Sequence, residues 1–335
     1  MRTIATPAGA ARRAEAQPRR GAQLLRQMWG ARWCYAFMLP SLVLTGMFSL
    51  YPTVASWYFS LFDWTGVTNT KYFIGLQNYI ELVHDQYFWN AFGRSILFMV
   101  TSVPLELGLS LVVAIVLNDR ALKLAPVYRT LFFLPVVTTT AIMAIVMSFV
   151  FSAYNGPANA ALMGLHITDR PIDFLGDPRT ALYTGVVVAV WKWFGQPMIY
   201  WLAGLQTIPE VVYEAARVDG AGWWRTLWSI TLPLLTPFAV IILLIVAVGN
   251  LQVFALLQAM TNGGPFFATE TMELYIYRVA FAATPGYTGQ PRLGYASAAG
   301  VVFGLCIMVL AIFQVLAFRK LRNADVPIGG AGRLG

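Results

Sequence analysis

The chain has 335 residues, of which 58% are hydrophobic and only 11% are charged. A typical soluble domain carries about 25% charged residues, so this composition excludes an ordinary soluble protein and indicates a membrane protein. The net charge of +8 is found in nucleic-acid-binding proteins, but Lys and Arg also collect on the cytoplasmic side of membrane proteins, so we expect no nucleic-acid partner.

Residues 1–32 form a basic, Ala-rich arm without the apolar core of a cleavable signal peptide. Residues 33–318 contain six apolar stretches of roughly the 20 residues that cross a bilayer. They are Trp33–Tyr58, Phe92–Leu117, Leu131–Ser152, Ala181–Leu205, Phe238–Met260 and Leu293–Phe318. Strands of a membrane barrel would instead alternate over about ten residues. The expected fold is therefore all-α and polytopic, with six transmembrane helices and a tail over residues 319–335.

The distribution of basic residues predicts the orientation of these spans. Sixteen of the 23 Lys and Arg residues lie in the N-terminal arm, the loops after spans two and four, and the C-terminal tail, whereas the other three loops hold five. Basic loops stay in the cytoplasm. Both termini and the loop over residues 206–237 are therefore expected to be cytoplasmic, as part of a multi-pass protein of a bacterial or archaeal cytoplasmic membrane.

The loop over residues 206–237 is polar, although it joins two apolar spans. Thr207, followed by Pro209 and Glu210, predicts a capped helix start, and Gly220 predicts its end, because Gly accepts a positive φ without steric cost. A second short helix is expected next, before Pro233 and Pro237 interrupt the chain ahead of the fifth span.

The first of these two helices displays a carboxylate beside two small residues, Glu214, Ala215 and Ala216. From the residues alone, two interpretations stay open. The helix inserts into a groove on a soluble partner, or it lies on the membrane surface as an amphipathic helix.

The spacing E-A-A, three residues, G, nine residues, I, one residue, L-P is met at every fixed position. These are Glu214, Ala215, Ala216, Gly220, Ile230, Leu232 and Pro233. The segment resembles the EAA loop in permease subunits of binding-protein-dependent ABC importers. That resemblance implies a type I importer fold and a loop that docks on a separate ATPase. The residues implied to make the contact are Glu214, Ala215, Ala216, Asp219 and Gly220.

Three further motifs look like those of carbohydrate importers. They are "FIGLQNYIEL" at Phe73–Leu82, "YRTLFFLP" at Tyr128–Pro135, and "TNGGP" followed by "ETMELYIYRVAF" at Glu270–Phe281. In this order they resemble the first permease subunit of maltose- and glycerol-phosphate-type systems. Disaccharide, oligosaccharide, polyol and glycerol-phosphate importers share these motifs.

The resemblance implies a second permease, an ATPase dimer, an extracytoplasmic solute-binding protein and a sugar-type solute as partners. The chain has no G-x-x-x-x-G-K-[ST] motif for binding ATP phosphates. We therefore expect no cofactor on this chain, with ATP and Mg bound by the partner ATPase.

Polar residues inside the spans are the candidates for internal functional groups, because such residues usually face the bundle interior. Glu106 and Lys192 lie at depths that differ by only about 4–5 Å. They either neutralise each other or share polar neighbours, or they are satisfied separately by water or backbone carbonyls. The candidates for contact with the solute are Asn250, Gln196, Trp193, Tyr200 and Gln252. Asn250 is the strongest of them, because it resembles a sugar-contacting Asn of the maltose-type subunit. For each candidate, an interhelical hydrogen bond is the alternative.

Two other classes of function remain as alternatives. An ion-coupled carrier or channel would transport without an ATPase and would have no use for the docking loop. An intramembrane enzyme would need a catalytic site, yet His84 and His166 have no metal-type spacing and no nucleophile–base pair is evident. We therefore expect no catalytic residue and no metal site.

Overall fold

A computed structural model describes residues 32–119, 121–281 and 289–324. The N-terminal arm before Arg32 and the tail after Ala324 lie outside the described residues. The chain divides into two units, residues 1–55 and 56–335. In the first unit, α2 (Arg32–Thr45) continues through a π-helical turn, η1 (Gly46–Leu50), into the start of α3 (Tyr51–Phe59).

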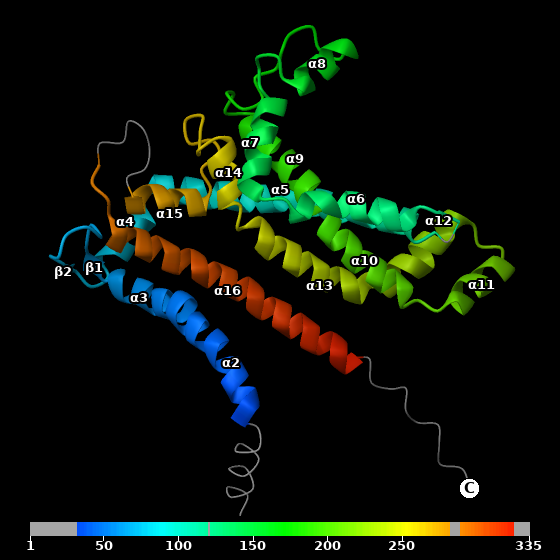
Figure 1. Cartoon of the computed structure of the whole chain (residues 1–335), viewed down its shortest axis with the longest axis horizontal. Coiled ribbons are helices and arrows are strands. Elements are labelled where there is room, and N and C mark those ends of the chain that lie inside the picture. The colour runs from blue at the N-terminus through cyan, green and yellow to red at the C-terminus, as the bar shows by residue number, and fades with distance from the viewer. Residues whose placement is uncertain (1–31, 120, 282–288, 325–335) are drawn as a thin grey trace, which may run out of the picture. The chain divides into compact units, whose positions relative to one another are not determined.

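The described residues of the second unit contain helices and one small sheet (Figure 1). The sheet pairs β1 (Phe62–Asp63) and β2 (Tyr72–Phe73) in antiparallel fashion. The helices follow in this order: α4 (Gln77–His84), α5 (Gln86–Leu117), α6 (Ala125–Val137), α7 (Thr140–Val150), α8 (Pro157–Gly164), α9 (Ala181–Trp193), α10 (Gly195–Gln206), α11 (Glu210–Val218), α12 (Trp223–Thr226), η2 (Leu227–Thr231), α13 (Leu232–Asn250), α14 (Phe254–Met260), α15 (Met272–Phe281) and α16 (Leu293–Ala324).

Helix α5 is the central element of the second unit. Phe88 and Ala91, near its start, pack with α15 and α16. Phe98 packs with α7, α9 and α14, and Val103 and Leu117, further along, pack with α10 and α13. Burial of these apolar side chains against one helix holds the bundle together, while the many exposed apolar residues are suited to contact with lipid.

The membrane-protein fold class is confirmed, since four helical stretches among the described residues are long and apolar enough to cross a bilayer. They are Arg32–Phe59, Gln86–Leu117, Trp223–Asn250 and Leu293–Phe313. Predicted span three is a broken pair, α6 and α7, bent by 97°. Predicted span four consists of α9 and α10, which meet at Phe194.

The fifth span differs from its prediction. It begins at Trp223 instead of Phe238 and ends at Asn250, and α14 is a separate short helix. Proline removes a backbone donor and clashes with the carbonyl four residues earlier, which is why Pro233 was expected to stop the helix. Here the π-helical turn η2 lies directly before Pro233, as η1 lies before Pro52. The wider turn changes the hydrogen-bond register, so the helix continues past the proline.

A lobe between α7 and α9 carries α8 and projects from the rest of the second unit (Figure 1). Asn159 holds it together, because its side chain donates to the carbonyls of Ser152 and Ile172 and accepts from the Ile172 N–H at 2.9 Å. The lobe is short, and the described residues between α7 and α9 form no large additional domain.

Candidate functional site

The loop between α10 and α12 forms a helical hairpin that turns at Gly220. Helix α11 ends as predicted, with Gly220 at φ 72°. The N–H of Gly220 donates to the carbonyl of Arg217 at 3.1 Å, and the N–H of Ala221 donates to the carbonyl of Ala216 at 2.9 Å. This pair of bonds is the Schellman arrangement, which satisfies the last carbonyls of a helix and needs a positive φ. The predicted bend is therefore confirmed.

The start of α11 differs from the prediction. Pro209 occupies the position before the helix, and no side chain caps it. The hydroxyl of Thr207 instead donates to the carbonyl of Gly204 at 2.7 Å. Thr207 therefore satisfies the end of α10, because a threonine hydroxyl can bond back to a carbonyl three residues earlier.

Some side chains on and next to α11 are exposed, whereas others are buried. Glu214, Ala215 and Asp219 are exposed, as a docking surface requires. Ala216 is only 5% exposed. Its methyl group therefore packs within the hairpin, and of the two alanines only Ala215 is available at the surface.

The second arm of the hairpin is continuous with the fifth span. Trp223, Trp224 and Trp228 are all exposed on this arm. The hydroxyl of Tyr213 on α11 lies 3.4 Å from that of Thr231 on η2. This contact links the two arms of the hairpin.

Asn250, at the end of α13, is 5% exposed and contacts α5. Its Nδ2 donates to Oε2 of Glu106 at 2.9 Å and to the carbonyl of Val246 at 3.0 Å. The sequence left two interpretations for Asn250, solute contact or an interhelical hydrogen bond. In the structure it forms an interhelical hydrogen bond with Glu106.

Lys192 is fully buried, and it is not paired with Glu106. Its Nζ donates to the carbonyls of Pro135 at 3.0 Å and Thr138 at 2.9 Å. Glu106 has Asn250 as its partner. The two intramembrane charges are thus satisfied separately, which was the second of the two interpretations.

The other solute candidates in span four are partly buried. Nε2 of Gln196 donates to the hydroxyl of Tyr200 at 3.0 Å, and the Lys192 ammonium lies 4.4 Å from the Trp193 ring centroid. Gln252 follows α13 and is exposed. These contacts join neighbours within span four and do not gather the candidates around one point.

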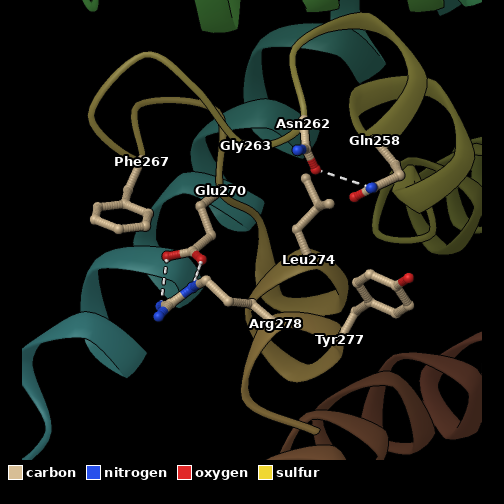
Figure 2. A pocket seen from close by; sticks show the side chains of 8 residues that line it. All are labelled: Gln258, Asn262, Gly263, Phe267, Glu270, Leu274, Tyr277 and Arg278. Atoms are coloured by element: carbon tan, nitrogen blue, oxygen red, sulfur yellow. Dashed lines mark hydrogen bonds and ion pairs between the residues drawn. The ribbon is translucent and has the colours of Figure 1, made fainter. Parts of the chain in front are cut away.

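A small polar pocket lies between α14 and α15, in a region that contains no predicted site residue. Figure 2 shows Glu270 and Arg278 facing each other, with Gln258 and Asn262 joined by a separate hydrogen bond. The lining residues are Gln258, Asn262, Gly263, Phe267, Glu270, Leu274, Tyr277 and Arg278.

Glu270 and Arg278 form a buried ion pair in which the carboxylate receives two hydrogen bonds from the guanidinium. Phe267 stacks near the same guanidinium, 4.8 Å from its ring centroid. A spacing of eight residues across the start of α15 gives no simple sequence signal for this pair.

A second polar cluster joins α4, α5, α15 and α16. Asp85 caps α5 by accepting from the Tyr87 N–H at 2.8 Å, and it also accepts from the hydroxyls of Tyr275 and Tyr295. Burial acts to raise the pKa of Asp85, but these hydrogen bonds outweigh it and hold the pKa below its ordinary value.

The neighbouring pair of Glu81 and Arg292 is partly exposed. Two N–H···O bonds of 2.6 and 2.7 Å join them. The hydrogen bond from Arg292 lowers the pKa of Glu81, although burial opposes the shift. Exposed pairs of this kind contribute about 0–1 kcal/mol, so Asp85 is the stronger link at this end of the bundle.

Comparison with known proteins adds a family match. Residues 106–323 match the family described as "Binding-protein-dependent transport system inner membrane component". The chain is 33% identical over 288 residues to the lactose transport system permease protein LacF of Rhizobium radiobacter, covering 85% of this chain and 94% of that protein. It is 32% identical over 292 residues to the sn-glycerol-3-phosphate transport system permease protein UgpA of Yersinia enterocolitica, covering 86% and 95%.

A solved structure shares the fold. One chain of a bacterial ABC transporter involved in the import of the acidic polysaccharide alginate superposes with a TM-score of 0.71 and 21% sequence identity. The match covers 90% of this chain and 99% of that chain.

Proposed function

Because the chain belongs to the family of binding-protein-dependent transport system inner membrane components, we propose that it forms part of the path of a sugar or sugar-like solute across the cytoplasmic membrane. The chain is a transport permease subunit and not an enzyme. Its relatives include permeases of lactose, trehalose/maltose and sn-glycerol-3-phosphate transport systems, which supports a carbohydrate-type solute.

The proposed partners are a second, related permease, an ATPase dimer that binds ATP and Mg, and an extracytoplasmic solute-binding protein. Six spans would make half of the transport pathway for the solute, so a second permease would complete that pathway. Both termini and the hairpin would lie in the cytoplasm, as the distribution of Lys and Arg indicates.

The observation that carries the proposal is the hairpin at Gly220. Glu214 on α11 and Asp219 directly after it are exposed, and Tyr213 of the same helix contacts Thr231 in the membrane-spanning arm. A short helix with an exposed carboxylate and a neighbouring Ala215 suits insertion into a cleft on the ATPase. Closure of the ATPase dimer on ATP would pull this helix, and the spans would rock between inward-open and outward-open states around a fixed site.

Co-purification tests the docking. The tagged chain is co-expressed with the other subunits of its importer, and the ATPase retained after affinity purification is quantified. Glu214→Arg is expected to reduce the retained ATPase at least tenfold, because it reverses the displayed charge. Gly220→Trp is expected to act similarly, because a bulky side chain strains the positive φ.

Asp169→Arg supplies the matched control, since Asp169 is an exposed carboxylate in the α8 lobe. It makes the same charge change far along the chain from the hairpin and should retain the ATPase. If Glu214→Arg and Asp169→Arg retain equal amounts, and the complex still hydrolyses ATP in response to its binding protein, the docking assignment is wrong. Solute uptake by the chain without any ATPase would favour the ion-coupled carrier or channel.

A further inference from the structure

We propose that Lys192 acts as a tethered cation that closes the break in span three and fixes the angle between α6 and α7. The two half-helices meet at 97°. Thr138 and Thr139, between them, have extended backbones with ψ of 149° and 124°. A break of this kind inside a membrane leaves carbonyl groups without helical partners, and each unsatisfied group costs several kcal/mol in lipid.

Two carbonyls at this break share one donor from span four, and the Pro135 carbonyl also accepts from the Thr138 hydroxyl at 2.6 Å. Pro135 and Thr138 belong to the C-terminal end of α6, where the helix dipole places partial negative charge. Nζ of Lys192 donates to both carbonyl oxygens, at 3.0 and 2.9 Å. The ammonium therefore supplies the Thr138 carbonyl with a donor and places positive charge at the negative end of the α6 dipole.

This arrangement resembles a cation site more than an ion pair. Within the described part of the chain, Lys192 makes no ion pair with a carboxylate, and its Nζ also lies over the Trp193 ring, 4.4 Å from the ring centroid. Carbonyls of unwound helix segments coordinate free cations in some transporters. Here a covalently attached ammonium occupies the equivalent position.

The neighbouring backbone geometry shows why the ammonium can reach this point. Gly195 starts α10, and a Cβ atom there would overlap the carbonyl oxygen of Phe132 in α6. The absence of a side chain thus lets spans three and four approach closely. Because α6 packs on α10 whereas α7 packs on α14, the angle at Lys192 determines how two parts of the bundle are held together.

The first test is chemical rescue of Lys192→Ala within the assembled importer in detergent. The substitution removes three methylenes and the ammonium, which propylammonium can replace. The readout is the midpoint of heat-induced loss of the monodisperse complex in size-exclusion chromatography. We expect the midpoint to fall by roughly 5 °C or more. We also expect propylammonium chloride to recover at least half of that loss.

Three controls separate charge from volume and from general salt effects. An equal concentration of 1-propanol has the same shape without the charge and should recover little. Propylammonium should leave the wild type and Lys123→Ala unchanged, because Lys123 is exposed. Equal recovery by 1-propanol, or no recovery by propylammonium, would overturn the proposal.

A second comparison remains informative if Lys192→Ala does not fold. Lys192→Arg retains a cation with several donors, whereas Lys192→Met retains the length and removes the charge. The amount of chain in the membrane fraction should be at least fivefold higher for Lys192→Arg than for Lys192→Met. Equal or greater accumulation of Lys192→Met would show that the cation is dispensable and would refute the tethered-cation role.

Discussion

Asn250 of α13 donates a hydrogen bond to Glu106 of α5 at 2.9 Å, within the interior of the bundle. Asn250→Leu keeps a side chain of similar size but leaves Glu106 without this donor. We expect a loss of about 1–3 kcal/mol in the free energy of unfolding. Thermal unfolding of the purified complex checks the loss, with exposed Gln252→Leu as the control.

Exchanging the amide and the carboxyl group of this pair gives a second test. Asn250→Asp places two carboxyl groups together and should destabilise more than Asn250→Leu. Combining it with Glu106→Gln restores one carboxyl and one amide, so the double variant should be more stable than Asn250→Asp alone. A double variant that is no more stable than Asn250→Asp would mean that this contact does not couple α5 and α13.

Gly220 and Gly222 form a natural comparison in the hairpin. A Cβ atom would meet no neighbour within 4 Å at either position, but Gly220 has φ of 72° and Gly222 has φ of −70°. Gly220→Ala should therefore cost about 1–2 kcal/mol from backbone strain alone, and Gly222→Ala should be nearly neutral. Hydrogen exchange of the Gly220 and Ala221 region measures the difference, and equal protection in both variants would contradict the strained-turn explanation.

Asp85 predicts a pH-dependent contribution to stability. Its pKa is lowered in the folded chain, so its contribution is fully present above its unfolded pKa of about 3.9 and is lost as the pH falls through the folded value. Asp85→Asn should lower the thermal unfolding midpoint relative to wild type at pH 7. At pH 3 the difference between the two midpoints should be smaller. Asp169→Asn, at an exposed site, serves as the control, and a gap that widens on acidification would refute the prediction.

Gly195 predicts a steric limit where spans three and four meet. Gly195→Ala would push a methyl group against the carbonyl of Phe132 and to 3.1 Å from Cα of Phe133. Overpacking of this kind typically costs 1–3 kcal/mol. Gly108→Ala, in a helix where no atom lies within 4 Å of the new Cβ, should be neutral. Equal unfolding midpoints for the two variants would show that the backbones can separate without cost.

Features with a local cause were predictable from the sequence. The fold class followed from apolar stretches long enough to cross a bilayer. The bend at Gly220 followed from the freedom of glycine at positive φ, and it required no knowledge of the rest of the chain. The family was identified by resemblance, because all fixed positions of the EAA motif lie within twenty consecutive residues.

Features that depend on a distant partner were not predictable. The carbonyl groups that bind Lys192 carry no side-chain identity, and they became acceptors only because α6 and α7 are bent apart. Similarly, Thr207 could cap either of two helices, and the choice of α10 depends on the position of the Gly204 carbonyl. Pro233 was misinterpreted because the preceding π-helical turn has no clear sequence signal.

The unbroken helix from Trp223 to Asn250 has a mechanical consequence. Its 28 residues follow a helical path about 42 Å long, with the hairpin at one end and the Asn250–Glu106 contact at the other. A continuous helix with no loop between its ends passes a displacement at one end on to the other. A force applied to the hairpin would therefore act on the hydrogen bond between Asn250 and Glu106. No loop lies between the hairpin and this bond to absorb the displacement.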